Sequence, residues 1–201
     1  MRVSKEQAAR NRQTILDTAA RLFRERGIAG VGVADLMKEA GFTHGGFYNH
    51  FPSKEALAAE ACGSAFNQAL ATLVEELSRE KGRDSSALAR YLDHYLSPAH
   101  RDDPAGGCPT AALAVDAGRQ GAPVQATYAA GIEALLEILV THLPRMKSAR
   151  KATESAAARE QALRTLSEMV GALVLSRAVA DANPALSDEI LEASRRSICQ
   201  R

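Results

Sequence analysis

Three helix-terminating signals within the first 52 residues most constrain how this 201-residue chain can fold. Gly27 and Gly41 each follow a stretch of helical periodicity, and Pro52 follows a third one. Glycine commonly ends a helix because it adopts the left-handed backbone conformation without steric cost, and proline cannot continue a helix. The segments between these signals are short, so the region is predicted to form a unit of three packed helices.

The remainder of the chain is also predicted to be helical. Alternation of β-branched residues is nowhere sustained, while Ala, Leu, Glu, Arg and Gln dominate. The fold class is therefore predicted to be all-α, with a helix-turn-helix unit over residues 1–52 and a larger helical domain over residues 53–201. The predicted helices cover residues 7–26, 33–40, 44–50, 53–80, 85–97, 108–119, 122–142, 152–182 and 185–199, with a loop at residues 97–107.

Composition excludes several classes of protein. No window approaches the roughly 18 apolar residues of a membrane span, and the N-terminus lacks the apolar stretch of a secretory signal. The three cysteines, Cys62, Cys108 and Cys199, form no CxxC pair, so neither a disulfide framework nor a cysteine-based zinc site is predicted. We expect a reduced, cytoplasmic protein with no metal and no cofactor.

Charge is unevenly distributed along the chain. The first 54 residues hold nine Lys and Arg against five Asp and Glu, although the whole chain has a net charge of only +1. Such a split indicates an anionic partner such as nucleic acid, and a solvated basic helix face is the competing interpretation.

The sequence THGGFYNHF, residues 43–51, places two glycines inside the third predicted helix. Each interior glycine costs a helix about 1 kcal/mol relative to alanine, so their presence needs a reason. Phe47 and Phe51 lie four residues apart and are expected to anchor an inner face. His44 and Tyr48 then share the outer face, and the glycines would let the backbone approach a partner closely.

Three stretches carry a family resemblance. ILDTAARLFRERG, VADLMKEAG and FTHGGFYNHFPSKEAL resemble, in order and spacing, the N-terminal domain of the tetracycline-repressor (TetR) family of bacterial regulators. The resemblance implies a supporting helix, a helix-turn-helix whose third helix enters the major groove, and a linking helix that starts near Ser53. One departure is Val31-Gly32, where the family usually has Thr or Ser, so Gly32 can cap the second helix only through its backbone.

The DNA contacts follow from this assignment. Thr43 is expected to cap the recognition helix, Tyr48 to contact a phosphate or a thymine methyl group, and Asn49 to read adenine or remain solvated. The basic N-terminus, with Arg2, Lys5, Arg10 and Arg12, either reaches phosphates or is a frayed, solvated terminus. The candidate DNA-binding residues are Gly32, Val33, Thr43, His44, Gly45, Tyr48, Asn49, His50 and Lys54.

The larger domain is expected to bind a small-molecule effector between its helices. For any single candidate residue, the competing and favoured interpretation is a satisfied core position, with the Tyr hydroxyls pointing to water. Cys108 follows two glycines at a predicted helix N-terminus, which lowers a thiol pKa, so a redox or electrophile sensor is an alternative to a small buried residue. The candidate ligand-binding residues are Phe66, Tyr91, His94, Tyr95, Cys108, Thr110, Leu113 and Tyr128.

The segment GALVLSRAVADANPALSDEIL, residues 171–191, resembles the two helices that commonly form a dimeric four-helix bundle in the family. An ordinary amphipathic core helix is the competing interpretation. The candidate dimer-interface residues are Gly171, Ala172, Leu175, Ser176, Val179, Leu186 and Ile190.

Together these features predict a homodimeric, non-enzymatic transcriptional repressor that a small molecule releases from double-stranded operator DNA. A thiol-based sensor regulator that uses Cys108 is one alternative, and a helical interaction protein that does not bind DNA is another. An all-helical enzyme is disfavoured, since the five histidines include no HExxH pair and no Ser/His/Asp spacing is found.

Overall fold

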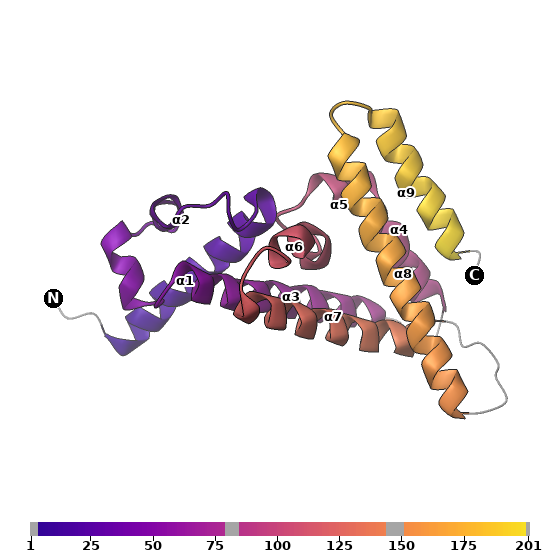
Figure 1. Ribbon diagram of the computed structural model, residues 1–201, viewed down its shortest axis with the longest axis horizontal. Coiled ribbons are helices and arrows are strands. Elements are labelled where there is room, and N and C mark those ends of the chain that lie inside the picture. The colour runs from indigo at the N-terminus through magenta and orange to yellow at the C-terminus, as the bar shows by residue number, and fades with distance from the viewer. Residues whose placement is uncertain (1–3, 79–84, 144–150, 200–201) are drawn as a thin grey trace. The chain divides into compact units, whose positions relative to one another are not determined.

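The computed structural model describes residues 4–78, 85–143 and 151–199, and every regular element in these ranges is helical. The predicted all-α fold is therefore confirmed (Figure 1). The elements are α1 (Lys5–Arg26), α2 (Val33–Glu39), the 3₁₀ helix η1 (His44–Asn49), α3 (Lys54–Ser78), α4 (Ser85–Tyr95), α5 (Pro98–Asp102), α6 (Pro109–Ala117), α7 (Ala122–His142), α8 (Lys151–Val179) and α9 (Pro184–Cys199).

The chain forms two compact units, and α3 and α7 each contribute to both. Unit 1 comprises Met1–Ala69 with Pro104–Gly131, and unit 2 comprises Leu70–Asp103 with Ile132–Arg201. A domain boundary at residue 52 stays a prediction, since the unit that includes residues 1–52 also includes the first part of α3, all of α6 and the start of α7.

Two helix starts differ from the sequence predictions by more than one residue, and a serine caps each of them. Helix α1 begins at Lys5 rather than residue 7, since the Ser4 hydroxyl accepts a hydrogen bond from Gln7 N at 3.1 Å. The predicted loop at residues 97–107 contains α5, whose cap is Ser97 and whose first residue is Pro98. A serine followed by proline is a helix-start signal, so α5 was predictable from the sequence.

Unit 1 is built around the apolar face of α1. Ile15, Leu22 and Phe23 are fully buried there, as the periodicity predicted, and α1 packs against α2 and α6. Gly27 ends α1 with a positive φ of 73°, and the next amide, Ile28 N, donates to Asp116 Oδ1 of α6 at 3.0 Å. The end of α1 is therefore tied to the last turn of α6 by a side chain that the sequence analysis did not single out.

Unit 2 is organised by α8 and α9, which run side by side and are joined by a short turn (Figure 1). Between them lies a buried pair of hydroxyl groups, with Ser176 Oγ and Ser187 Oγ 2.7 Å apart and each also bonded to the other residue's carbonyl. Arg177 of α8 donates to the carbonyl oxygens of His100 and Arg101, both at 2.9 Å, and so fastens α5 to this pair of helices.

One sequence expectation about apolar segments needs correction. Helix α7 is the single described helix with the length and hydropathy of a membrane span, although its sequence includes Glu133 and Glu137. Length and composition alone give it this property, which core helices of globular proteins share.

Candidate nucleic-acid interface

The turn between α2 and η1 is formed by backbone hydrogen bonds around a glycine in the left-handed conformation. Gly41 has a φ of 82°, its N–H donates to Lys38 O at 3.1 Å, and Phe42 N donates to Met37 O at 2.8 Å. These bonds satisfy carbonyl groups that the end of α2 would otherwise leave unpaired. The turn fixes where η1 starts relative to α2, as a helix-turn-helix requires.

The recognition segment is a 3₁₀ helix over His44–Asn49, shorter than the helix predicted for residues 44–50. Thr43 occupies the cap position, but its side chain makes no capping bond, so the expectation that its hydroxyl caps this helix is wrong. The Thr43 carbonyl instead accepts from Gly46 N at 3.0 Å. Two adjacent glycines and a following proline weaken regular α-helix, which accounts for the tighter 3₁₀ form.

The inner face of η1 is aromatic. Phe47 and Phe51 are both buried, and their ring centroids lie 5.8 Å apart. Met37 of α2 reaches the same region, since its methyl group lies 3.7 Å from where a Cβ on Gly46 would be. These contacts hold η1 against α2, as the sequence predicted for the two phenylalanines.

The outer face of η1 is polar and exposed. The Tyr48 side chain is 65% exposed although its ring meets Phe47 edge to face, with centroids 5.2 Å apart and planes at 89°. This contact fixes the direction of a large ring that solvent otherwise surrounds. The other candidate contacts divide by exposure: Thr43, His44, Gly45, Asn49 and Gly32 are exposed, whereas Val33, His50 and Lys54 are half-buried.

The two glycines differ in what surrounds them. A Cβ added to Gly45 would meet nothing within 4 Å, and one added to Gly46 would make only ordinary van der Waals contacts at 3.7 Å. Neither glycine is therefore required by packing within the chain. An unfilled position on the exposed face of η1 leaves room for a partner to approach the backbone.

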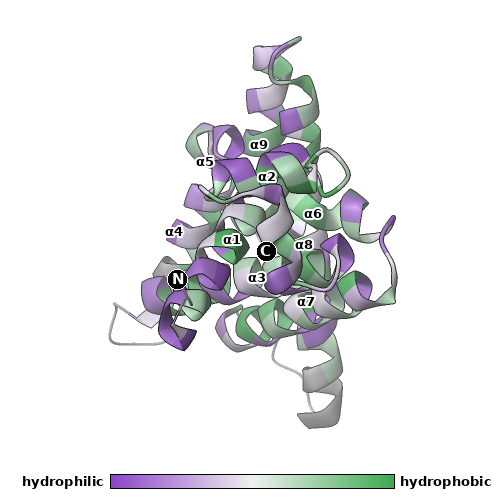
Figure 2. Ribbon diagram, turned by 90° about the vertical axis from the view of Figure 1, so that its left-hand side faces the viewer, coloured by the Kyte–Doolittle hydropathy of each residue, from purple (hydrophilic) through white to green (hydrophobic). Residues whose placement is uncertain are grey.

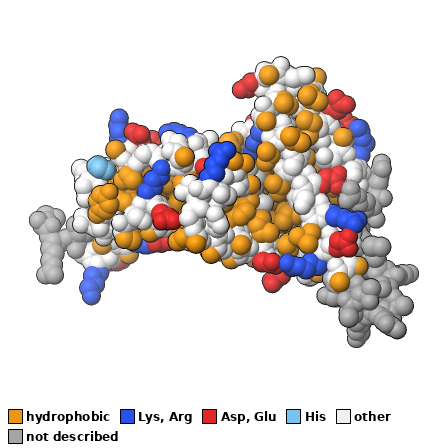
Figure 3. Space-filling view, in the orientation of Figure 1, with side chains coloured by type: hydrophobic (Ala, Val, Ile, Leu, Met, Phe, Trp, Pro, Cys, Tyr) orange, Lys and Arg blue, Asp and Glu red, His pale blue; other side chains and the backbone are white. Residues whose placement is uncertain are grey.

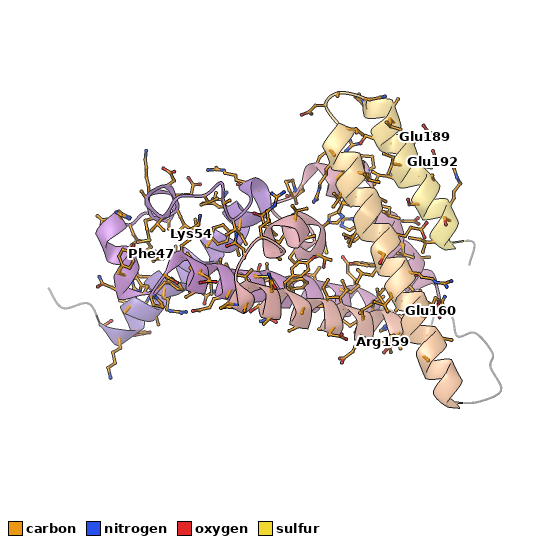
Figure 4. All side chains as sticks on the ribbon, viewed as in Figure 1. Phe47, Lys54, Arg159, Glu160, Glu189 and Glu192 are labelled. Carbon is orange, nitrogen blue, oxygen red and sulfur yellow. The ribbon has the colours of Figure 1, made fainter. Side chains whose placement is uncertain are left out.

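The caps of α2 and α3, the helices on either side of η1, agree with the sequence predictions. Gly32 is the cap residue of α2 and makes no side-chain capping bond, as expected of the departure from the family pattern. Ser53 caps α3, since its Oγ accepts from Ala56 N at 3.0 Å. In Figure 4 the labelled side chains of Phe47 and Lys54 lie near one another, at the same end of unit 1.

The basic N-terminal residues have different environments. Arg2 lies outside the described residues, and the first turns of α1, near the N label in Figure 2, are strongly hydrophilic. Arg10 pairs with Glu6 at 3.0 Å on the surface of α1. Arg12 instead forms an ion pair with Glu60 of α3 at 2.6 Å, so it is not a frayed, solvated side chain.

Five of the eight candidate ligand-binding residues belong to unit 1. Phe66 and Tyr128 pack edge to face at 5.5 Å, and the Tyr128 hydroxyl donates to Thr110 O at 2.7 Å instead of pointing to water. Leu113 and Cys108 are buried, the latter with 9% exposure at the cap position of α6.

Burial, followed by the charges of Cys108 and Cys62, raises the pKa of the Tyr128 hydroxyl. Cys62 is a further buried thiol that the sequence analysis did not select, and burial raises its pKa to about 11. Only the tertiary fold associates Cys62 with Tyr128, so no sequence pattern marks it.

The other three candidate ligand-binding residues belong to unit 2. The ring centroids of Tyr91 and Tyr95 are 5.8 Å apart, which agrees with their predicted common helix face. His94 is exposed and stacks at 5.8 Å on His100, a buried histidine that the sequence analysis overlooked. The eight candidates are thus divided between the units rather than collected in either one.

The candidate dimer residues also divide by burial. Leu175 and Leu186 are 59% and 40% exposed, while Gly171, Val179 and Ile190 are half-buried. Ala172 and Ser176 are buried inside their own protomer. Figure 3 shows apolar side chains gathered over the ends of α8 and α9 that the short turn joins.

No group of three metal-ligating side chains occurs among residues 4–78, 85–143 and 151–199.

Comparisons with known proteins agree with this arrangement. The family profile described as "Bacterial regulatory proteins, tetR family" matches residues 15–61, which include the second half of α1, all of α2 and η1, and the start of α3. The HTH-type transcriptional regulator AcrR of Shigella flexneri is 33% identical over 95 residues, covering 47% of this chain and 44% of that protein. An HTH-type transcriptional regulator of Mycobacterium tuberculosis (strain CDC 1551 / Oshkosh) is 28% identical over 179 residues, covering 86% and 87% of the two chains. This chain spans less than half the length of the first curated relatives it matches.

Solved structures share the fold over nearly the whole chain. The reduced form of Escherichia coli NemR superimposes with a TM-score of 0.75 at 22% identity, covering 94% of this chain and 95% of NemR. A TetR-family regulator from Cytophaga hutchinsonii gives a TM-score of 0.77 at 23% identity, covering 100% and 98%. The matched profile over residues 15–61 thus shows similarity of the helix-turn-helix to the tetR family of bacterial regulatory proteins, and the solved structures show that the fold beyond it is shared as well.

Proposed function

We propose that this protein is a homodimeric transcriptional regulator, a repressor, that places η1 in the major groove of double-stranded operator DNA. The observation that carries the proposal is the outer face of η1. There Tyr48 is exposed and the space beside Gly45 is unfilled, while Phe47 and Phe51 are buried beneath them. Neutral side chains that donate and accept hydrogen bonds can read base edges, and Lys54 supplies positive charge for a phosphate.

Salt dependence of DNA binding tests this proposal directly. Affinity for DNA from the upstream region of its own coding sequence is measured against a scrambled duplex over a range of salt concentrations. Each neutralised phosphate contributes a log–log slope of about −0.9, so a dimer with one Lys54 contact per subunit should show about −2 or steeper. A slope near zero would contradict DNA binding and favour an interaction protein instead.

Two variants test the residue assignments. Tyr48→Phe removes the hydroxyl and keeps the ring, and Lys54→Ala removes the cation. Each is expected to weaken operator binding by about tenfold for a dimer, which loses two contacts. Lys54→Ala should also make the salt slope shallower, while Tyr48→Phe should leave it unchanged. Wild-type affinity in both variants would refute these assignments.

Dimerisation is proposed to use the exposed apolar side chains of α8 and α9. Leu163, Leu175 and Leu186 are large apolar residues that α8 and α9 leave exposed. A Cβ added to Gly171 would meet nothing within 4 Å. An unfilled glycine position permits the close approach of a second helix. Leu175→Glu would bury a charge in this face, so sedimentation should show monomers where the wild-type chain shows dimers.

A small-molecule effector is proposed to release the operator by favouring a different subunit arrangement. A thermal-shift screen of neutral hydrophobic compounds tests this, because a ligand at 100 times its Kd stabilises the folded state by about 2.7 kcal/mol. Each stabilising compound is then added to the DNA complex, where dissociation is the expected result.

A thiol-based sensor is the second candidate, favoured by one observation. Cys108 lies at the cap position of α6, a helix N-terminus, and is 9% exposed. NemR, whose fold this chain shares, has a structure described as its reduced form. If a thiol is the sensing group, an electrophile should release operator DNA from the wild type and not from Cys108→Ser. Equal release of operator DNA from both proteins would show that Cys108 is not the sensing group.

A further inference from the structure

Arg12 lies on α1, in contact with the corner where η1 ends and α3 begins. We infer that Arg12 is a positioning residue for DNA binding: together with Glu60 it clips this corner in place, and it is not itself a phosphate ligand. The inference rests on the proposed DNA-binding function, and it replaces the sequence-based suggestion that Arg12 reaches phosphates.

The clip connects three segments of unit 1. Arg12 Nη2 lies 2.7 Å from Glu60 Oε1 and 2.6 Å from Oε2, so the guanidinium of α1 holds the carboxylate of α3. Arg12 Nε also donates to the carbonyl oxygen of His50 at 3.4 Å. His50 directly follows η1, so one side chain fixes the end of the recognition segment to both neighbouring helices.

The same guanidinium covers an aromatic ring of the inner face. Its central carbon lies 4.4 Å from the ring centroid of Phe51, within the range of a cation–π interaction. Phe51 in turn stacks on Phe47, which carries the exposed Tyr48 ring edge to face. Contacts therefore run continuously from Arg12 to the side chain proposed to meet DNA.

The charge balance distinguishes a clip from a phosphate ligand. The side chains of Arg12 and Glu60 are 39% and 41% exposed, so each is accessible, but the carboxylate already neutralises the guanidinium. If Arg12 bound a phosphate, Glu60 would compete with the DNA, and removing its charge would strengthen binding. If the pair acts as a clip, removing either partner weakens binding, because the corner is no longer held. The two roles therefore predict opposite effects of Glu60→Gln.

A matched control exists on the same helix. Arg10 lies two residues before Arg12, and its partners Glu6 and Gln7 both belong to α1. Arg10→Gln removes the same charge as Arg12→Gln without disturbing any contact between elements. A difference between these two variants therefore reports the clip rather than the loss of one positive charge.

The experiment uses the full chain and a duplex selected from random-sequence DNA by the wild-type protein. Arg12→Gln, Arg12→Lys and Glu60→Gln are each expected to weaken binding by about five- to tenfold, with the salt slope unchanged. Arg12→Lys is informative because lysine keeps the charge and loses the forked geometry. Arg10→Gln should bind within about twofold of the wild type, as expected for an exposed intrahelical pair.

Three results would overturn the inference. The first is a salt slope that is shallower by about 1.8 in Arg12→Gln, which would indicate one lost phosphate contact per subunit of the dimer. The second is tighter DNA binding by Glu60→Gln. The third is wild-type DNA affinity in Arg12→Lys. A wild-type protein that selects no duplex would overturn the proposed function and this inference with it. If the wild type binds DNA and all three variants bind it with the same affinity, the inference is wrong but the proposed function stands.

Hydrogen exchange in the absence of DNA gives a readout independent of binding. Without the clip, backbone amides of residues 47–53 should exchange about tenfold faster in Arg12→Gln than in the wild type or Arg10→Gln. Exchange in α8 and α9, which belong to unit 2, should not change. Unchanged exchange at residues 47–53 would show that Arg12 does not hold the corner.

Discussion

At the scale of single residues, glycines in and near the recognition segment have separable roles. Gly41 is needed for its backbone conformation, with a φ of 82°, whereas Gly45 needs neither a special φ nor the absent side chain for packing within the chain. A residue that costs helix stability without a structural reason points to a requirement imposed by a partner.

Gly45→Ala is therefore expected to keep or slightly raise the melting temperature and to weaken operator binding by about tenfold or more. Gly41→Ala is the control, and it is expected to lower the melting temperature. Alanine in the left-handed conformation costs about 1 kcal/mol or more of folding free energy. Thermal unfolding and DNA titration of both variants test the distinction. A Gly45→Ala protein with wild-type affinity would mean that the duplex does not approach this position.

A second residue-scale prediction concerns His100, which is 8% exposed and whose Nδ1 lies 2.8 Å from Tyr95 O. Burial lowers the pKa of His100, the bond to the Tyr95 carbonyl partly opposes this, and the positive charges of Arg177 and His94 lower it further. The folded state thus binds a proton less readily than the unfolded chain, whose histidine pKa is about 6.5. Stability should therefore fall as the pH drops through about 6.5.

Chemical denaturation at pH 7.5 and at pH 5.5 measures the effect, and the free energy of unfolding is expected to be lower at pH 5.5. His100→Asn keeps a donor near the position of Nδ1 and removes the titration, so its stability should depend less on pH. His142→Asn, which alters an exposed histidine, is the control and should retain the dependence of the wild type. Equal pH profiles for His100→Asn and the wild type would contradict the prediction.

At the scale of helices, unit 1 depends on close contacts between α3 and α7. A Cβ on Gly131 would lie 2.3 Å from the Phe66 ring, and one on Gly63 would lie 3.2 Å from the Thr127 methyl group. Gly131→Ala is therefore expected to cost about 1–3 kcal/mol of folding free energy through overpacking. Gly118→Ala at the end of α6 is the control, because a Cβ there would make only ordinary contacts at 3.8 Å. Denaturant midpoints of the two variants, measured with equal m-values, test the difference.

The bond from α6 to the end of α1 gives the other helix-scale prediction. Ile28 is buried, so removing the acceptor in Asp116→Ala leaves its N–H unsatisfied and should cost about 1–3 kcal/mol. Asp181→Ala changes an exposed carboxylate and should stay within about 0.5 kcal/mol of the wild type. A stable Asp116→Ala protein would show that water satisfies this amide.

At the scale of the whole molecule, each compact unit combines segments that are distant in the sequence. Residues 104–131 belong to the same unit as α1, α2 and η1, and the predicted boundary between two functional domains at residue 52 stays a prediction. Candidate effector residues consequently occur in both units, and the effector site is the least predictable part of the protein. Local sequence patterns describe neighbours along a helix, whereas an effector site needs residues from distant segments.

The sequence by itself determined the all-α class, most of the helix ends and the inner and outer faces of the recognition segment. These properties depend on nearest neighbours: helical periodicity, glycine and proline at helix ends, and residues three or four apart. Only the tertiary structure decided that Arg12 pairs with Glu60, that Asp116 accepts from Ile28 and that Cys62 and Cys108 both bear on Tyr128. Arg12 and Glu60 are 48 positions apart in the sequence, and Ile28 and Asp116 are 88 apart. Such contacts arise from packing that no local pattern encodes.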